Sequence, residues 1–322
     1  MTIQDHLARI VDALRSSADV SPTVSTPLRN AVFTGSGDSL SSALLAQAHG
    51  HRAMSSGDIT FLGRLPVGVE TVVGISHSGT SGATVQALRL ARAAGARTIA
   101  ITSNAQSPLA QAADAVQVVP TLALDESVPV AGHLMLGLGV AAVCGDDVDG
   151  ATDALADLLD AHASVVDDTL DALPVEAPQG VSLLSLPDLR GAADFWMLKL
   201  IEATGIVVRT VPLEESGHVD YFLGPQAHLA VQLIGAHSRF RFDRLATALT
   251  HTGQTVVQVS FPQRSGSDER DALLLELSGA VVGTVIAEAA AERWGRPPFR
   301  GGAVNMDAAH IKLDAEALVA GA

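Results

Sequence analysis

The sequence predicts an α/β protein in which parallel strands alternate with helices. Short apolar runs recur along the chain, and the segments between them carry apolar residues at helical spacing. Strands that are apolar throughout are typical of a parallel sheet covered by helices on both faces. The chain has 322 residues, of which 48% are hydrophobic and 17% charged. It is therefore long enough for two folded domains, and its composition excludes disorder.

The first half of the chain carries one set of alternating elements. An amphipathic helix over the first 18 residues and a polar break at 21–27 precede this set. Predicted strands cover 31–34, 59–62, 71–75, 98–102 and 115–119, and predicted helices cover 40–51, 83–94, 107–113 and 130–143. Gly95 directly follows one of these helices, as expected for a glycine that ends a helix.

The second half repeats the plan after an acidic, alanine-rich stretch. Predicted strands cover 181–186, 206–211, 228–234 and 255–261, and predicted helices cover 190–204, 240–251 and 272–294. We therefore expect an N-terminal helix and linker at 1–29, a first domain at 30–146, a helical linker at 147–179, a second domain at 180–300 and a C-terminal tail at 301–322.

Composition argues against several classes of function. The 35 acidic residues outnumber the 20 basic ones and give a net charge of −15, whereas nucleic-acid binding needs a lysine and arginine stripe. Cys144 is the only cysteine, which excludes an intrachain disulfide and a multi-cysteine metal site. The histidines show no helical metal-binding pair, so we expect no metal. A signal-peptide pattern and a membrane-length apolar segment are both missing, which predicts a soluble, cytoplasmic protein.

Two loops rich in serine and glycine follow predicted strands and precede predicted helices. Ser76–Gly82 combines four hydroxyl groups with the backbone N–H groups of a helix N-terminus, and this combination binds a phosphate dianion. The alternative is that Ser81 is an ordinary N-cap in a serine-rich turn. The loop Gly35–Ser39 lacks the third glycine of a dinucleotide-binding loop, so we interpret it as a second ligand-facing loop.

Four pieces of the first half match one known family. They are Gly35-x-Gly-x-Ser39, Ile75–Ser81, the run 87–102 and Ser107–Asp114. With these pieces, residues 30–143 resemble a sugar isomerase (SIS) domain. The resemblance implies two domains of this kind, each a five-stranded parallel sheet flanked by helices in a flavodoxin-like three-layer sandwich. It also implies that the protein binds a phosphosugar.

The same resemblance implies substrate-binding roles for residues of the first domain. It assigns Ser76, Ser78 and Ser81 to the phosphate of the substrate, and it places Ser39 near the sugar or the phosphate. His77 stands where relatives often have glutamine, and we expect it at the same site.

Two pieces of the second half, Leu198–Glu202 and Glu215–His218, resemble the catalytic SIS domain of double-SIS enzymes. The resemblance implies that Glu202 carries a proton between C1 and C2 and that His218 helps to open the sugar ring, often from the neighbouring subunit. Lys199 is one of two lysines in the chain and shares a helix face with Glu202. Glu215 is a candidate for orienting the site. The alternatives are a solvated Lys–Glu pair and a surface histidine.

These features together predict a cofactor-free aldose–ketose isomerase that acts on a sugar phosphate through a cis-enediol and forms a homodimer. Two alternatives stay open, namely a phosphofructosamine deglycase and a non-catalytic phosphosugar-binding regulator. Enzymes of the resembling kind carry an active-site lysine in their C-terminal tail, for which Arg300 and Lys312 are the candidates here.

Overall fold

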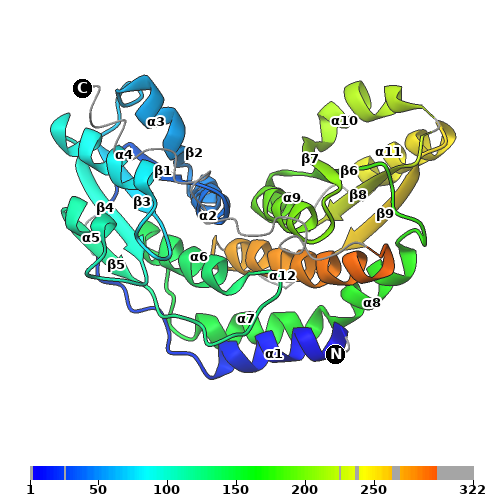
Figure 1. Cartoon of the computed structure of the whole chain (residues 1–322), viewed down its shortest axis with the longest axis horizontal. Coiled ribbons are helices and arrows are strands. Elements are labelled where there is room, and N and C mark those ends of the chain that lie inside the picture. Colours follow the sequence, from blue (N-terminus) through cyan, green and yellow to red (C-terminus); the bar gives the residue numbers. More distant parts are fainter. Residues whose placement is uncertain (1–2, 25–26, 225, 236–238, 263–268, 296–322) are drawn as a thin grey trace. The chain divides into compact units, whose positions relative to one another are not determined.

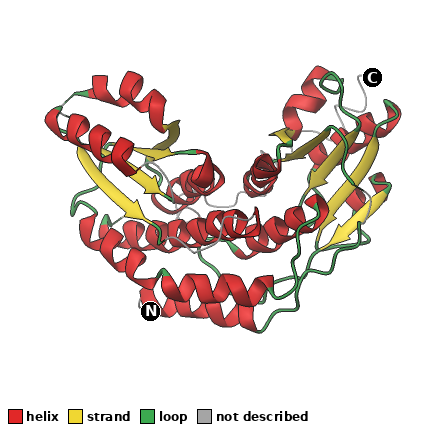
Figure 2. Cartoon of the chain, turned by 180° about the vertical axis from the view of Figure 1, so that it is seen from behind, coloured by secondary structure: helices red, strands yellow, loops and turns green. Residues whose placement is uncertain are grey.

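The computed structural model describes residues 3–24, 27–224, 226–235, 239–262 and 269–295. The chain divides into two compact units. One contains 16–123 and 131–152 and is called the first-sheet unit, and the other contains 3–15, 124–130 and 153–295 and is called the second-sheet unit. Each unit is a parallel sheet flanked by helices (Figures 1 and 2), so the predicted α/β fold is confirmed.

The first-sheet unit contains the predicted five-stranded parallel sheet, in the order β2-β1-β3-β4-β5. Its strands are β1 Ala31–Gly35, β2 Arg52–Ser55, β3 Thr71–Ile75, β4 Arg97–Thr102 and β5 Ala115–Val118. Its helices are α2 Asp38–Leu44, the 3-10 helix η1 Leu45–His49, α3 Ser56–Leu62, α4 Gly82–Ala93, α5 Pro108–Ala112 and α6 Ala131–Cys144. Both β1 and β3 are buried along their whole length, as expected for central strands.

The predicted strand at 59–62 is wrong, because these residues lie in helix α3. Ser55 caps this helix by accepting a hydrogen bond from the Gly57 N–H, and Ile59 is buried while Phe61 is exposed, as on a one-sided helix. The second strand instead lies at Arg52–Ser55, at the edge of the sheet. Its partial exposure explains why it carries no apolar run.

The strand order of the first sheet reverses between β1 and β3. These two strands are neighbours, but the chain leaves β1 toward β2 on one side and β3 toward β4 on the other. Helix α2 packs against α6, whereas α4 packs against α3 and α5. In open α/β sheets, ligands bind where the strand order reverses in this way. The two serine-rich loops follow these two strands.

The second-sheet unit has four parallel strands in the order β7-β6-β8-β9 among its described residues, where the resemblance implied five. The strands are β6 Gly180–Ser185, β7 Val207–Pro212, β8 His228–Ile234 and β9 Thr255–Ser260. Its helices are α1 Ile3–Arg15, α7 Ala151–Ala161, α8 Ala163–Ala172, η2 Pro187–Leu189, α9 Arg190–Thr204, α10 Leu213–Val219, η3 Asp220–Leu223, α11 Arg239–His251 and α12 Glu269–Arg293.

Helix α12 is a core element of the second-sheet unit. By length and composition it could cross a membrane, but most of its apolar stretch is buried, and it packs against α9 and α8. Gly283 and Gly279 permit the close approach to α9, since a Cβ at Gly283 would collide with the Trp196 ring. Trp196 Nε1 donates to the Gly279 carbonyl at 2.6 Å. These contacts explain the apolar composition of α12 without a membrane.

The N-terminal helix α1 and the segment 124–130 belong to the second-sheet unit. His6 and Ser127 both contact the Glu288 carboxylate on α12, and Arg9 donates to the Asp125 carbonyl at 2.5 Å. Figures 1 and 2 show α1 running alongside α7. These contacts tie two segments that are distant in sequence to one core.

Candidate functional site

The loop between β1 and α2 is shaped by two glycines. Gly35 lies against the Ser39 backbone so closely that any side chain would collide with it, and Gly37 has a φ of 58°, where glycine is favoured. Ser39 lies in the first turn of α2, and its N–H donates to the Ser36 carbonyl at 3.2 Å. This tight turn presents Ser36 and Ser39 at the carboxyl edge of the first sheet.

The loop Ser76–Ser81 is held in place by its backbone. The His77 carbonyl accepts hydrogen bonds from the Ser103 N–H at 3.0 Å, the Ser103 hydroxyl at 2.8 Å and the Thr102 hydroxyl at 3.0 Å. Gly79 has a φ of 68° and lies directly against Ser107. The Leu109 N–H on α5 donates to the Gly79 carbonyl at 3.0 Å, so backbone carbonyl groups attach the loop to α5 and to the end of β4.

Ser81 occupies the N-cap position of α4 but does not cap the helix. Its side chain makes no capping hydrogen bond; the hydroxyl instead accepts from Thr84 Oγ1 at 3.0 Å. By contrast, Ser55 and Ser107 cap α3 and α5 in the usual way. The simple N-cap interpretation of Ser81 is therefore wrong. The first N–H groups of α4 keep their capacity to bind an anion at the positive end of the helix dipole.

The remaining polar groups of this loop add hydroxyl groups and a neutral ring. Ser78 is exposed, and its hydroxyl lies 2.8 Å from that of Thr80. Ser76 is only 5% exposed. The His77 ring packs beside Gly132 at the start of α6, and burial lowers the pKa of this histidine. At neutral pH it therefore contributes an uncharged ring, and anion binding would fall to hydroxyl and N–H groups.

In the second-sheet unit, the structure joins Lys199 and Glu202 on α9. Lys199 Nζ lies 2.9 Å from Glu202 Oε2, and it also lies 4.8 Å from the centroid of the Phe195 ring. The Lys199 side chain is fully buried, while one-third of the Glu202 side chain is exposed. The alternative of a solvated pair is therefore wrong. Burial of the ammonium group costs desolvation free energy, which its attraction to the Glu202 carboxylate offsets in part.

The other two candidates of this unit, Glu215 and His218, lie on α10. Both side chains are exposed, while Leu213 and Ser216 on the same helix are buried. His218 is therefore exposed, as the alternative of a surface histidine expects. The candidates Arg300 and Lys312 lie outside the described residues.

Helix α10 is followed directly by a buried charged residue, Asp220, which sequence reasoning missed. Asp220 Oδ1 accepts hydrogen bonds from Arg209 at 2.6 Å and from Ser182 at 2.5 Å. The ring of His228 lies 2.8 Å from Ser182, and Gln254 donates to the Asp220 carbonyl at 2.6 Å. These contacts anchor the end of α10, and no local sequence pattern indicates them because the partners come from three strands.

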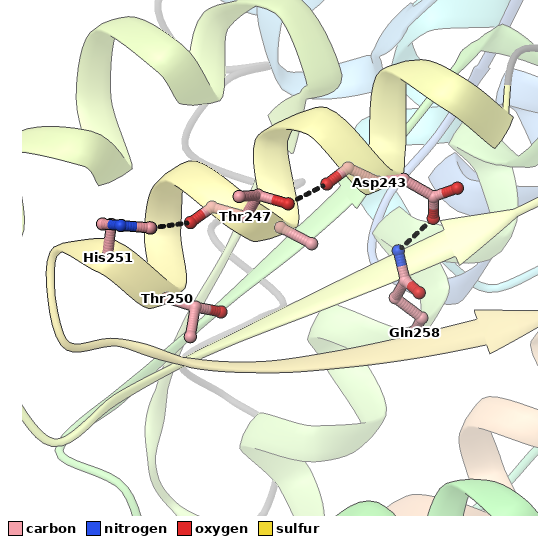
Figure 3. Close-up of a pocket in the computed structure, with 6 residues that line it drawn as sticks. Asp243, Thr247, Thr250, His251 and Gln258 are labelled. Atoms are coloured by element: carbon pink, nitrogen blue, oxygen red, sulfur yellow. Dashed lines mark hydrogen bonds between the residues drawn. The ribbon is translucent and has the colours of Figure 1, made fainter.

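A surface hollow on α11 and β9 is lined by Asp243, Thr247, Thr250, His251 and Gln258 (Figure 3). Its polar groups bond to one another. Gln258 donates to Asp243 at 3.0 Å, Thr247 donates to the Asp243 carbonyl at 2.9 Å, and the His251 ring contacts the Thr247 carbonyl at 3.2 Å. The hollow contains none of the predicted site residues. Among the described residues, no cluster of acidic, histidine or cysteine side chains is arranged to hold a metal ion.

Comparison with known proteins matches one stretch of the chain to a family. The SIS domain family matches residues 69–128, which contain the loop Ser76–Ser81. No curated protein matches the chain.

Three solved structures illustrate the shared fold. Glucosamine-6-phosphate deaminase from Thermotoga maritima is 17% identical, with a TM-score of 0.68 and coverage of 92% of this chain and 95% of that one. Tagatose-6-phosphate ketose/aldose isomerase from Escherichia coli is 17% identical, with a TM-score of 0.66 and coverage of 92% and 88%. The C-terminal domain of glucosamine-fructose-6-phosphate aminotransferase from Francisella tularensis is 13% identical, with a TM-score of 0.66 and coverage of 92% and 96%. Residues 69–128 thus match the SIS domain family, and the chain shares the fold of these three solved structures.

Proposed function

We propose that this SIS-domain chain is a phosphosugar aldose–ketose isomerase that moves a proton between C1 and C2 through a cis-enediol, without a cofactor. The observation that carries the proposal is the uncapped N-terminus of α4. It lies behind a hydroxyl-rich loop at the point where the strand order of the first sheet reverses. Fold alone does not define an activity, so the proposal rests on the chemistry of the two sites.

Phosphate binding is assigned to Ser76, Ser78 and Ser81, with Ser39 and His77 beside them. A dianion needs several donors, and hydroxyl groups with helix N–H groups supply them. The net charge of −15 repels an anionic substrate over long distances. Attraction must therefore be local, and a hydroxyl-rich loop with a helix N-terminus can provide it.

Proton transfer is assigned to Glu202, with Lys199 as its partner. One carboxylate placed at C1 and C2 is sufficient to take a proton from one carbon and return it to the other. Lys199 holds one carboxylate oxygen at 2.9 Å and leaves the partly exposed group facing outward. Because its side chain is fully buried, Lys199 acts on the reaction through Glu202 rather than by contact with the sugar.

Ring opening is assigned to His218, with Glu215 one turn before it on α10. Three apolar side chains follow this histidine: Val219 is 38% exposed, Tyr221 44% and Phe222 76%. An exposed apolar surface of this kind is typical of a protein interface. It supports the further proposal that the protein is a homodimer in which His218 lies at the subunit interface.

The test is turnover of a panel of hexose and hexosamine phosphates in deuterated water, followed by NMR at C1 and C2. We expect deuterium to enter one of these carbons with at least one substrate. Glu202→Gln should abolish exchange while sugar-phosphate binding is retained, and Glu214→Gln, at an exposed carboxylate on α10, serves as the control. Retained exchange in Glu202→Gln contradicts the assignment of the base. Release of an amine from a phosphorylated fructosamine supports the deglycase, and binding without any exchange supports a regulator.

A further inference from the structure

Four hydroxyl groups connect the two ligand loops of the first-sheet unit. Ser36 Oγ lies 2.7 Å from Ser56 Oγ, and Thr84 Oγ1 lies 3.3 Å from Ser56 Oγ and 3.0 Å from Ser81 Oγ. Ser56 and Thr84 are completely buried, whereas Ser36 is exposed and Ser81 is partly exposed. The four residues come from the β1–α2 loop, α3 and α4. We call them the hydroxyl relay.

We propose that Ser56 and Thr84 are positioning residues that turn the hydroxyl protons of Ser36 and Ser81 toward a bound phosphate group. Each hydroxyl has one proton to donate. Thr84 can give its single proton to Ser56 or to Ser81, and Ser81 is the closer acceptor. When Thr84 donates to Ser81, Ser56 can donate to Ser36, and the four hydroxyl groups form two donor–acceptor pairs. Ser81 then accepts from Thr84 and Ser36 accepts from Ser56, so each of these two hydroxyl groups can donate its own proton to the phosphate. This inference rests on the proposed phosphate-binding function of the loop and adds how its donors are oriented.

The orientation matters because every oxygen of a phosphate dianion is an acceptor. A free serine hydroxyl rotates and presents a lone pair as readily as a proton, so fixing its proton outward strengthens binding. A hydrogen bond from a buried donor is also stronger than one in water, because the protein interior has a lower dielectric constant. The loop Ser76–Ser81 contains no lysine or arginine. Oriented hydroxyl groups are therefore a substitute for positive charge in this loop.

Thr84 has a second effect on the same site. An N-cap serine normally accepts a hydrogen bond from an N–H in the first turn of its helix. Here the Ser81 hydroxyl is bonded to Thr84 Oγ1 and makes no cap. The relay thus keeps Ser81 away from the first N–H groups of α4 and leaves these groups to the anion. Removing the Thr84 hydroxyl should release Ser81 to cap the helix and compete with the ligand.

The test compares three threonine variants of the full chain. Thr84→Val removes the relay hydroxyl with little change of shape, and Thr84→Ser keeps it. Thr34→Val is the matched control, because Thr34 is equally buried in β1 and its hydroxyl has no hydrogen-bond partner in the described part of the chain. Calorimetric titration with inorganic phosphate and with glucose 6-phosphate gives the dissociation constants, and thermal unfolding reports folding.

We expect Thr84→Val to weaken binding of both ligands by roughly tenfold, the effect of about one hydrogen bond. Thr84→Ser and Thr34→Val should stay within about twofold of the unchanged protein. Ser56→Ala interrupts the relay from the other side and should weaken binding in the same direction. With a sugar phosphate that the enzyme converts, Thr84→Val should raise KM and change kcat little.

Several outcomes would overturn the inference. If Thr84→Val and Ser56→Ala bind both ligands as tightly as the unchanged protein does, the positioning role of the relay is refuted. The loop would still be a phosphate site. Equal weakening by Thr84→Val and Thr34→Val shows a general packing effect. If the unchanged protein binds neither ligand, the proposed function fails together with the relay. If Thr84→Val does not fold, Ser56→Ala and Thr84→Ser decide the question by the same titrations.

Discussion

Lys199 and Glu202 form an ion pair of 2.9 Å in which the ammonium group is fully buried and the carboxylate is one-third exposed. The asymmetry predicts unequal effects of removing each partner. Lys199→Met replaces the buried cation by an apolar chain of similar length and should change the free energy of unfolding by less than about 1 kcal/mol. Glu202→Ala leaves the cation buried without this partner and should cost about 3 kcal/mol. Urea unfolding of both variants measures the difference, and a smaller cost for Glu202→Ala than for Lys199→Met contradicts the assigned burial.

Substitution of Gly79 tests whether the proposed phosphate loop depends on the positive φ and the close contact with Ser107 at this position. Gly79→Ala places a side chain at a φ of 68° and against Ser107, which caps α5. It should lower the free energy of unfolding by about 3 kcal/mol and weaken phosphate binding. Gly63→Ala is the control, since Gly63 has a φ of 61° but open space around it, and it should cost about 1 kcal/mol. Equal effects of the two variants in urea unfolding would show that the contact with Ser107 is unimportant.

The raised pKa of the Glu276 carboxyl group should make the free energy of unfolding depend on pH. Burial raises the pKa of this carboxyl group from 4.5 to about 8, although its oxygens accept hydrogen bonds from the Gly191 and Ala192 N–H groups. Between these two values the folded state holds a proton that the unfolded state has lost. The free energy of unfolding therefore falls as pH rises through this window, by an amount on the order of 5 kcal/mol.

Glu276→Gln removes this dependence and provides the measurement. The amide stays neutral but has one acceptor oxygen for two N–H groups, so at pH 5 the variant should be less stable by about 1 kcal/mol. At pH 9 it should be more stable than the unchanged protein. Urea unfolding at several pH values shows whether the two stability curves cross. Parallel curves between pH 5 and 9 would contradict the raised pKa.

We expect the buried contacts of Asp220 to stabilise α10, the helix that carries His218. Asp220 is completely buried and bonded to Arg209, so Asp220→Ala should cost about 3 kcal/mol of unfolding free energy. Asp243→Ala is the control, because Asp243 pairs with Arg239 at 3.8 Å on the surface, and it should cost less than about 0.5 kcal/mol. Hydrogen exchange should become faster along α10 only in Asp220→Ala. Unchanged exchange there means that Asp220 does not anchor the helix that carries His218.

Much of the first sheet is predictable from the sequence because its central strands are buried on both faces. Apolar runs mark β1, β3 and β4 at nearly their observed positions. The edge strand β2 is partly exposed, so selection for apolar residues is absent there, and the helix α3 that follows it carries the more apolar sequence. The same reasoning explains α12, whose apolar composition reflects burial against α9.

The sequence by itself determined the α/β class, the positions of the serine-rich loops at strand ends, and the pairing of Lys199 with Glu202, because these follow from hydrophobic periodicity and helical spacing. The tertiary structure alone decided that Ser81 does not cap α4 and that Lys199 is buried. It alone joined Ser36, Ser56 and Thr84 into one relay and attached Asp220 to three strands. Such contacts depend on which strands become neighbours, and sheet order is set by packing over the whole unit rather than by the local sequence.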